Sequence, residues 1–182
     1  MRKAALWLGL WALPSTSVAF SLGSPICDVN VLPLIEMSPT LASPAPSGWG
    51  LRAETSYYVP GRALRVAVTQ PDPNKRARGV LVFAKTSPFS GVGSFALPPN
   101  AQYQYIPPPA QCGEWSISHT NADPKTIAEM QWDYTVPLAS NTVVLRAFVI
   151  EDCGLGSGGC RDQQALSNVV LLLEAIQVDG FE

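Results

Sequence analysis

The stretch Glu129-Met130-Gln131-Trp132-Asp133-Tyr134 alternates polar residues with large apolar ones. Because successive side chains of a β-strand point to opposite faces of a sheet, this pattern predicts a strand with one buried face. Met130, Trp132 and Tyr134 would share that face, where an indole fills the space between two sheets. Trp132 is therefore predicted to lie in a core, in preference to an exposed platform that stacks on a sugar ring.

Similar patterns lie on both sides of this stretch. Leu64, Val66 and Val68 alternate with polar or small residues, and Trp115 and Ile117 alternate with serines. More continuous apolar runs predict further strands over residues 79–86, 142–150 and 167–176. Proline, glycine and asparagine separate these runs. Seven to nine short strands with turns between them predict an all-β protein, a disulfide-stabilised β-sandwich.

Tyr58-Val59-Pro60-Gly61 predicts a turn ahead of the strand that contains Leu64. Proline fixes φ near −65° at the second position of a type II turn, and glycine accepts the positive φ that the third position needs. These two backbone properties explain the motif, so we expect a structural role for it.

Seven pieces of the chain, in their order and spacing, resemble the reeler domain, which occurs in reelin, spondins and small insect defence proteins. The pieces are Tyr58-Val59-Pro60-Gly61, Gly79-Val80-Leu81-Val82-Phe83-Ala84, Gly93-Ser94-Phe95, Cys112, Ser118-His119, Lys125, and Trp132 with Pro137 after it. The resemblance implies an immunoglobulin-like sandwich that acts as an extracellular binding module. It also makes Pro60, Gly61, His119 and Trp132 structural positions of the family.

The beginning of the chain has the features of an export signal. Arg2 and Lys3 precede an apolar run over residues 4–13, and small residues at Ser17 and Ala19 offer a cleavage site before Phe20. The run is too short to span a membrane, which takes about 20 apolar residues. We expect a secreted protein, extracellular or, in a bacterium, periplasmic, without a transmembrane anchor. The expected divisions are a signal peptide (1–19), a Pro/Ser-rich lead (20–50), the sandwich (51–176) and a tail (177–182).

Four cysteines in an exported chain predict two disulfides, for which three pairings are possible. Cys153 and Cys160 bracket a glycine-rich loop that is flexible enough to close on itself, which leaves Cys27 with Cys112. In reeler domains the early cysteine and the one before the histidine do pair, which agrees. The loop, residues 154–159, also satisfies the GxGxxG pattern, but too little chain follows for a dinucleotide fold, so no cofactor is expected.

The charge balance bears on possible ligands. Without Arg2 and Lys3 the chain has 10 basic and 14 acidic residues, and 10 − 14 gives a net charge of −4. General binding to nucleic acid is therefore not expected. Lys75, Arg76 and Arg78 form the one basic cluster, which could hold sulfates, phosphates or carboxylates of an acidic glycan. The alternative for this cluster is a solvated loop that keeps a strand edge from pairing with other chains.

His119 is the single histidine, and it decides most of the enzyme question. A metal site normally needs several His, Cys or carboxylate ligands, and oxidised cysteines would leave none of the usual sets. A hydrolase would need a serine within hydrogen-bond reach and an orienting carboxylate. Ser118 is adjacent, but in a regular strand it points to the opposite face. We expect a buried histidine, no metal and no enzyme, with a hydrolase using His119 as the least favoured alternative.

Tyr103 and Tyr105 lie beside three consecutive prolines and are the candidates for an exposed aromatic patch, with packing at a sheet edge as the other possibility. The favoured function is a secreted, non-enzymatic module that binds a cell-surface or matrix glycan or a surface protein. The alternative is a structural component that assembles through its strands or this patch into a larger surface complex.

Overall fold

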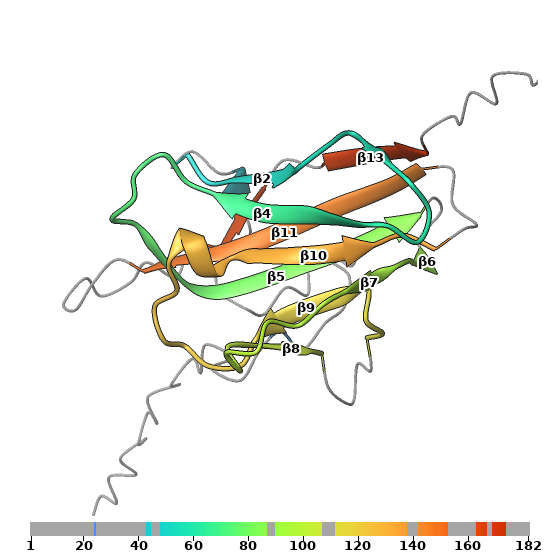
Figure 1. Ribbon diagram of the computed structural model, residues 1–182. Helices are drawn as coiled ribbons and strands as arrows, with labels where there is room; N and C mark the ends of the chain where they lie inside the picture. Colours follow the sequence, from blue (N-terminus) through green and yellow to red (C-terminus); the bar gives the residue numbers. More distant parts are fainter. Residues whose placement is uncertain are drawn as a thin grey trace, which may run out of the picture.

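The computed structural model is a sandwich of two β-sheets (Figure 1). It describes residues 24, 43–44, 48–86, 90–106, 112–137, 142–152, 163–166 and 169–173. The strands of the first sheet are β1 (Ser43–Pro44), β3 (Tyr57–Tyr58), β5 (Arg76–Thr86), β6 (Ser90–Gly91), β8 (Tyr103–Tyr105), β9 (Ser116–His119), β11 (Thr142–Asp152), β12 (Gln163–Ala165) and β13 (Val169–Leu173). Those of the second sheet are β2 (Gly50–Ala53), β4 (Ala63–Thr69), β7 (Ser94–Phe95) and β10 (Gln131–Thr135).

The two long strands β5 and β11 pair antiparallel at the centre of the first sheet, whose order is β1-β12-β11-β5-β9-β8. β13 also pairs with β11, β3 pairs with β13, and β6 pairs with the end of β5. The second sheet has the order β2-β4-β10-β7 and covers one face of β5 and β11 (Figure 1). A single turn of 3-10 helix, Ile127–Glu129, leads into β10.

The core lies between the facing sides of the two sheets. Alternate residues of β4 and β10 meet alternate residues of β5 and β11, as strand periodicity requires. The cluster includes Val66, Val82, Trp132, Tyr134 and Leu145. Trp132 is almost completely buried, and its ring packs edge-on against Tyr103 with 5.1 Å between centroids.

The outer face of the first sheet is buried as well. Leu81, Phe83 and Phe148 belong to this face and are buried although they lie outside the core cluster. The rings of Phe83 and Phe148 stack with 6.5 Å between centroids. On the same face the backbone N–H of Ser24 donates to Ser118 Oγ at 2.8 Å. β5 therefore has two buried faces, which explains its continuous apolar sequence.

The predicted all-β sandwich is confirmed, while its immunoglobulin-like type stays a prediction. The strand estimate of seven to nine was too low, because the described ranges contain 13 strands. Four of these, β1, β3, β6 and β7, have only two residues each, too few to show a period in the sequence. β5 begins at Arg76 and β11 continues to Asp152. Both long strands therefore extend into charged residues beyond the predicted ranges of 79–86 and 142–150.

Several predictions fall on residues that the structure does not describe. These are the signal peptide, Cys27, Cys153, Cys160, the glycine-rich loop, most of the lead and the tail. Cys112 is buried, and because the other three cysteines lie outside the described residues, the disulfides stay a prediction. In the described ranges no helix has the length and apolar character needed to cross a membrane.

Candidate functional site

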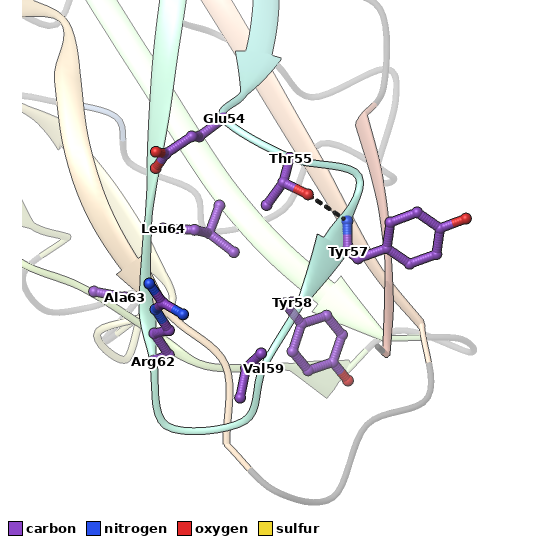
Figure 2. Close-up of a pocket in the computed structure, with 8 residues that line it drawn as sticks. All are labelled: Glu54, Thr55, Tyr57, Tyr58, Val59, Arg62, Ala63 and Leu64. Carbon is purple, nitrogen blue, oxygen red and sulfur yellow. Dashed lines mark hydrogen bonds between the residues drawn. The ribbon is translucent and has the colours of Figure 1, made fainter. Parts of the chain in front are cut away.

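A small cavity lies beside the turn that contains Pro60 and Gly61 (Figure 2). Gly61 has φ +74°, and the N–H of Arg62 donates to Val59 O at 3.0 Å, as a type II turn requires. The cavity measures about 300 Å³, at the lower end of the size range of ligand pockets. Its lining comes from one continuous segment, Glu54, Thr55, Tyr57, Tyr58, Val59, Arg62, Ala63 and Leu64.

The polar side chains that line this cavity are not arranged around a common ligand position. Arg62 is exposed and forms neither an ion pair nor a side-chain hydrogen bond within the described part of the chain. Thr55 Oγ1 already accepts the N–H of Tyr57, and Glu54 accepts the N–H of Arg65. The ring of Tyr57 points away from the other lining side chains (Figure 2). No group of polar side chains converges on one point here, so we do not place the binding site in this cavity.

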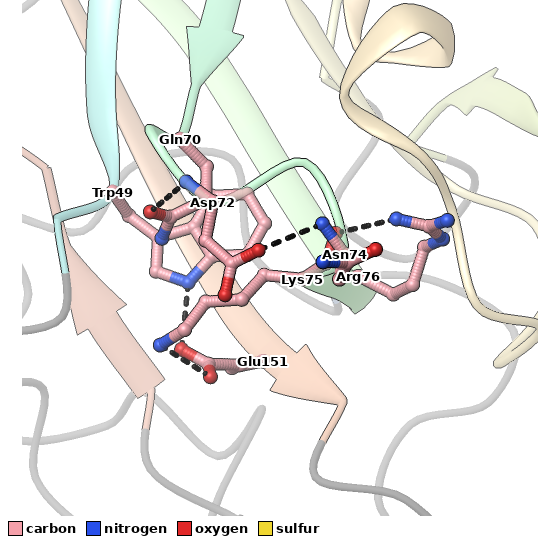
Figure 3. Close-up of polar contacts among 7 residues, drawn as sticks. All are labelled: Trp49, Gln70, Asp72, Asn74, Lys75, Arg76 and Glu151. Carbon is pink, nitrogen blue, oxygen red and sulfur yellow. Dashed lines mark hydrogen bonds and ion pairs between the residues drawn. The ribbon is translucent and has the colours of Figure 1, made fainter.

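The basic cluster lies at the other end of β4, where the chain passes from β4 into β5 (Figure 3). The connecting loop is fixed by side chains that bond nearby backbone, including Asp72 Oδ1, which accepts the N–H of Asn74 at 2.9 Å. Lys75, Arg76 and Arg78, all partly exposed, follow at the start of β5. Sequence alone placed these cations together, and the structure places them next to the end of β11.

Two of the three cations are ion-paired with the last two residues of β11. Lys75 Nζ lies 2.8 Å from Glu151 Oε1, and Arg78 Nε lies 2.7 Å from Asp152 Oδ1. The other oxygen of Glu151 accepts the indole N–H of the buried Trp49 at 2.8 Å, which fixes the carboxylate in place (Figure 3). The carboxylates of Glu151 and Asp152 could not be predicted from the sequence, because their contact with the cluster depends on the pairing of β5 with β11.

Despite these ion pairs, the cluster keeps N–H groups that can donate hydrogen bonds to a ligand. Arg76 directs one terminal nitrogen at the carbonyls of Pro73 and Lys75, at 2.6 and 3.0 Å. Arg78 bonds Asp152 through Nε alone, so the other four N–H groups of its guanidinium have no partner in the described ranges. Its side chain is 42% exposed. An oxyanion that approaches from solvent can therefore still receive hydrogen bonds from this cluster.

A β-bulge explains the direction of Arg78. Ile150 pairs with Gly79, but the next residue, Glu151, pairs with Ala77, so Arg78 is the extra residue of β5. Such a bulge bends the strand and changes the direction of a side chain, and bulges are common beside functional sites. The bulge therefore places the Arg78 guanidinium beside Asp152 at the end of the sandwich.

His119 is buried, with 2% of its surface exposed. Its Nδ1 lies 3.1 Å from the backbone N–H of Val80 and 3.3 Å from Ser118 Oγ. Ser118 lies on the outer face with Ser24, as expected from the alternation of a strand, yet its Oγ comes near His119 Nδ1 because both side chains reach the backbone of Val80. Ser118 Oγ, however, donates to Val80 O and accepts from Ser24, and it is 1% exposed. This buried pair is engaged with the backbone of Val80, which is a structural role.

Lys125 is the most deeply buried cation of the described residues. Its Nζ donates to the carbonyls of Asn121 and Asp123, both at 2.8 Å, and lies within 3.4 Å of Arg78 O. Burial lowers the pKa of Lys125, and the nearby carboxylates of Asp123 and Glu129 oppose that shift. Backbone bonds join Lys125 to Ala77 in both directions. Its ammonium cannot reach a ligand, so its role is to hold the chain around the bulge.

Tyr103 and Tyr105 pack at a sheet edge, which was one of the two alternatives, and do not form an exposed aromatic patch. Tyr103 is 3% exposed, because β8 pairs with β9 and turns this ring toward Trp132, and burial raises the pKa of its hydroxyl. Tyr105 is partly buried and donates to Phe95 O at 2.7 Å. Among the residues that the structure describes, the exposed large aromatic side chain is that of Tyr57, which lies beside Leu172 of β13. Its two-residue strand left no periodic signal in the sequence.

Comparisons with known proteins agree with this geometry. The model of the family described as the reeler domain matches residues 33–154. A crystal structure of the human F-spondin reeler domain has a TM-score of 0.57 at 17% identity and covers 74% of this chain and 94% of that one. A structure of the Reelin-N domain of F-spondin has a TM-score of 0.59 at 18% identity, with coverages of 74% and 92%. No curated protein matches the chain. Since the family match includes well over half of the residues, the chain belongs to the reeler domain family.

Proposed function

We propose that this chain is a secreted, non-enzymatic reeler module that binds an acidic cell-surface or matrix glycan through Lys75, Arg76 and Arg78. Membership of the reeler family supports an extracellular binding or structural module. The observation that carries the choice of site is the guanidinium of Arg78, which is turned to the end of the sandwich by a bulge and has four N–H groups to spare. Bridges from Cys112 to Cys27 and from Cys153 to Cys160, within an immunoglobulin-like sandwich, are part of this proposal.

The chemistry of the cluster suits sulfate groups on a sugar chain. Arginine presents its donors in a planar fork that matches the oxygens of sulfate and phosphate, and such charge-assisted bonds are stronger than neutral ones. Three cations within four residues can contact adjacent groups of a polymer, so weak individual contacts add up. The cluster thus supports local binding of a sulfated chain even though the whole protein is acidic.

The test is retention on immobilised heparin, a sulfated glycan, as salt is raised. Alanine at Arg76 and Arg78 should lower the salt concentration at which the protein elutes. Arg62→Ala is the matched control, because it removes an exposed positive charge at the opposite end of β4. Equal losses for Arg62→Ala and the cluster variants would mean that retention reflects overall charge, and the proposed site would be wrong.

An exposed apolar strip favours assembly as a second candidate function. Tyr57, Val170 and Leu172 are large exposed side chains on one face of the paired strands β3 and β13, and Leu173 is exposed at the end of β13. Contiguous apolar surface of this kind is common at protein contacts. Leu172→Ser should lower the mass measured by light scattering at high concentration if the strip mediates assembly. Leu97→Ser is the control, since Leu97 has similar exposure outside the strip. A monomer at every concentration would exclude this candidate.

A further inference from the structure

Two carboxylates meet the cations of the proposed glycan site from within the same chain. Glu151 and Asp152 end β11, and their side chains are each only 14% exposed. Lys75 and Arg78 opposite them are more accessible, and they form the two ion pairs at 2.8 and 2.7 Å. In the free protein, therefore, two of the three cations already have an anionic partner.

We propose that Glu151 and Asp152 determine the specificity of the site: they screen Lys75 and Arg78 from isolated carboxylates and admit ligands with closely spaced sulfate groups. This inference rests on the proposed function. It assigns the two acids a role that is distinct from holding the fold, and it names the class of ligand as a polysulfated glycan, in preference to a polymer of uronic acids.

The physical reason is competition at a high effective concentration. A carboxylate attached to the neighbouring strand acts as a partner at roughly millimolar concentration or above. A lone uronate carboxylate can bond the spare N–H groups of Arg78, but that single contact is made against the repulsion of two fixed acids. Adjacent sulfates can instead bind the spare N–H groups of Arg78 and the partly exposed Arg76 without displacing either acid. The internal acids thus weaken all binding and weaken that of uronates most.

The fixed position of Glu151 strengthens this role. Trp49 holds one carboxylate oxygen at 2.8 Å while Lys75 contacts the other, so this acid cannot rotate away when a ligand approaches. Asp152 is held through Arg78 and follows the bulge. An anion that reaches the cluster must therefore bind in the presence of two negative charges.

The experiment compares Glu151→Gln, Asp152→Asn and the double variant with the parent protein, on heparin and on a polyuronate that has no sulfate. Both amides keep an oxygen that can accept the bonds from Trp49 and Arg78, so the fold should survive, which circular dichroism would verify. If one substitution unfolds the protein, the other still tests the idea. Each change should tighten heparin binding by roughly two- to fivefold, the range of one exposed ion pair. The double variant should also gain binding to the polyuronate.

Asp133→Asn is the matched control. It removes one negative charge and releases one arginine, Arg65, from an ion pair of 2.7 Å on the second sheet. If Asp133→Asn tightens binding as much as the β11 variants, the effect is one of net charge and the inference is overturned. If alanine at Arg78 weakens heparin binding while the β11 variants behave like the parent, the glycan site stands and the screening role falls. If neither the parent nor the double variant binds heparin, the proposed function falls, and the inference falls with it.

Discussion

Replacing Lys125 by methionine tests whether a buried ammonium holds the chain around the bulge. Methionine has a similar length and fills most of the volume, but it cannot donate to the carbonyls of Asn121 and Asp123, each 2.8 Å from Nζ. The contacts of Nζ with Asn121 Oδ1 and Arg78 O, at 3.2 and 3.4 Å, are also lost. The backbone bonds between Lys125 and Ala77 remain, so the variant isolates the side chain.

The expected loss follows from these contacts. A hydrogen bond to a charged group contributes about 1.5–3 kcal/mol net, so the two short bonds together contribute about 3–6 kcal/mol. Methionine also removes the cost of desolvating the ammonium, whose existence is indicated by the lowered pKa of Lys125. The loop that supplies these carbonyls, residues 121–124, is partly exposed, so water can bond some of the carbonyls that the substitution frees. We therefore expect the free energy of unfolding to fall by about 2–4 kcal/mol.

Urea denaturation followed by tryptophan fluorescence measures this loss, since Trp49 and Trp132 are buried. Lys75→Met is the matched control, because it removes the same group from a partly exposed ion pair and should cost about 0–1 kcal/mol. Equal losses for the two variants would refute the reasoning, because they would show that the buried ammonium contributes no more than one at the surface.

Three other predictions concern the scaffold. Gly61 and Gly93 both have a positive φ, of +74° and +75°. A Cβ added at Gly61 would meet nothing within 4 Å, whereas one added at Gly93 would lie 2.5 Å from both Thr135 O and the hydroxyl oxygen of Tyr134. Gly61→Ala should cost about 1–2 kcal/mol in urea denaturation and Gly93→Ala at least about 2 kcal/mol more; equal losses would contradict the clash. Glu129→Gln should remove stability that depends on pH, because the hydrogen bonds from the Thr126 backbone and hydroxyl lower the pKa of Glu129 below its ordinary 4.5. A carboxyl with a lowered pKa contributes its stability above the unfolded pKa and loses it as the pH falls through the folded pKa. The stability gap between parent and variant should therefore shrink below pH 4.5, and a constant gap would argue against this mechanism. Trp49→Phe should lower stability by about 1.5–3 kcal/mol, because it removes a hydrogen bond to the carboxylate of Glu151, again measured in urea; no loss would show that the indole N–H contributes nothing.

Local patterns in the sequence were enough to predict the strands with a strong period. β4 and β10 alternate through their whole length, and in the structure Leu64, Val66 and Trp132 all face the core. For Tyr103 the sequence left two alternatives open, an exposed patch and packing at a sheet edge, and the structure shows the second. Its burial depends on the pairing of β8 with β9, which no local pattern encodes. Tyr57 was missed because a strand of two residues shows no period. Its neighbour Tyr58 is buried, whereas Tyr57 lies beside the exposed Leu172 on the other face of β3.

The cations of the candidate site could be predicted from the sequence, but the acids that pair with them could not. Three cations among the four residues 75–78 are visible in the sequence, because they need no partner to be recognised. Their acids are not, since Glu151 and Asp152 lie more than 70 positions away and meet them only through the register of β5 on β11. The bulge at Arg78 shifts that register by one residue, so even a correct pairing of the two strands would have placed Arg78 opposite the wrong partner.

Three buried polar residues of this fold, Ser118, His119 and Lys125, have one explanation in common, which is the edge of β5 between Leu81 and Ala77. The ladder of β9 stops at the pair of Leu81 with Ser118, so the backbone N–H and carbonyl of Val80 have no strand partner on that side. Buried backbone groups must still be hydrogen-bonded. His119 Nδ1 lies 3.1 Å from Val80 N, and Ser118 Oγ donates to Val80 O at 3.1 Å. Lys125 then continues the edge, with backbone bonds to Ala77 and its ammonium near Arg78 O. Side chains thus replace a strand where one ends beside a bulge, and they keep the backbone of Arg78 in place at the surface where its guanidinium meets solvent.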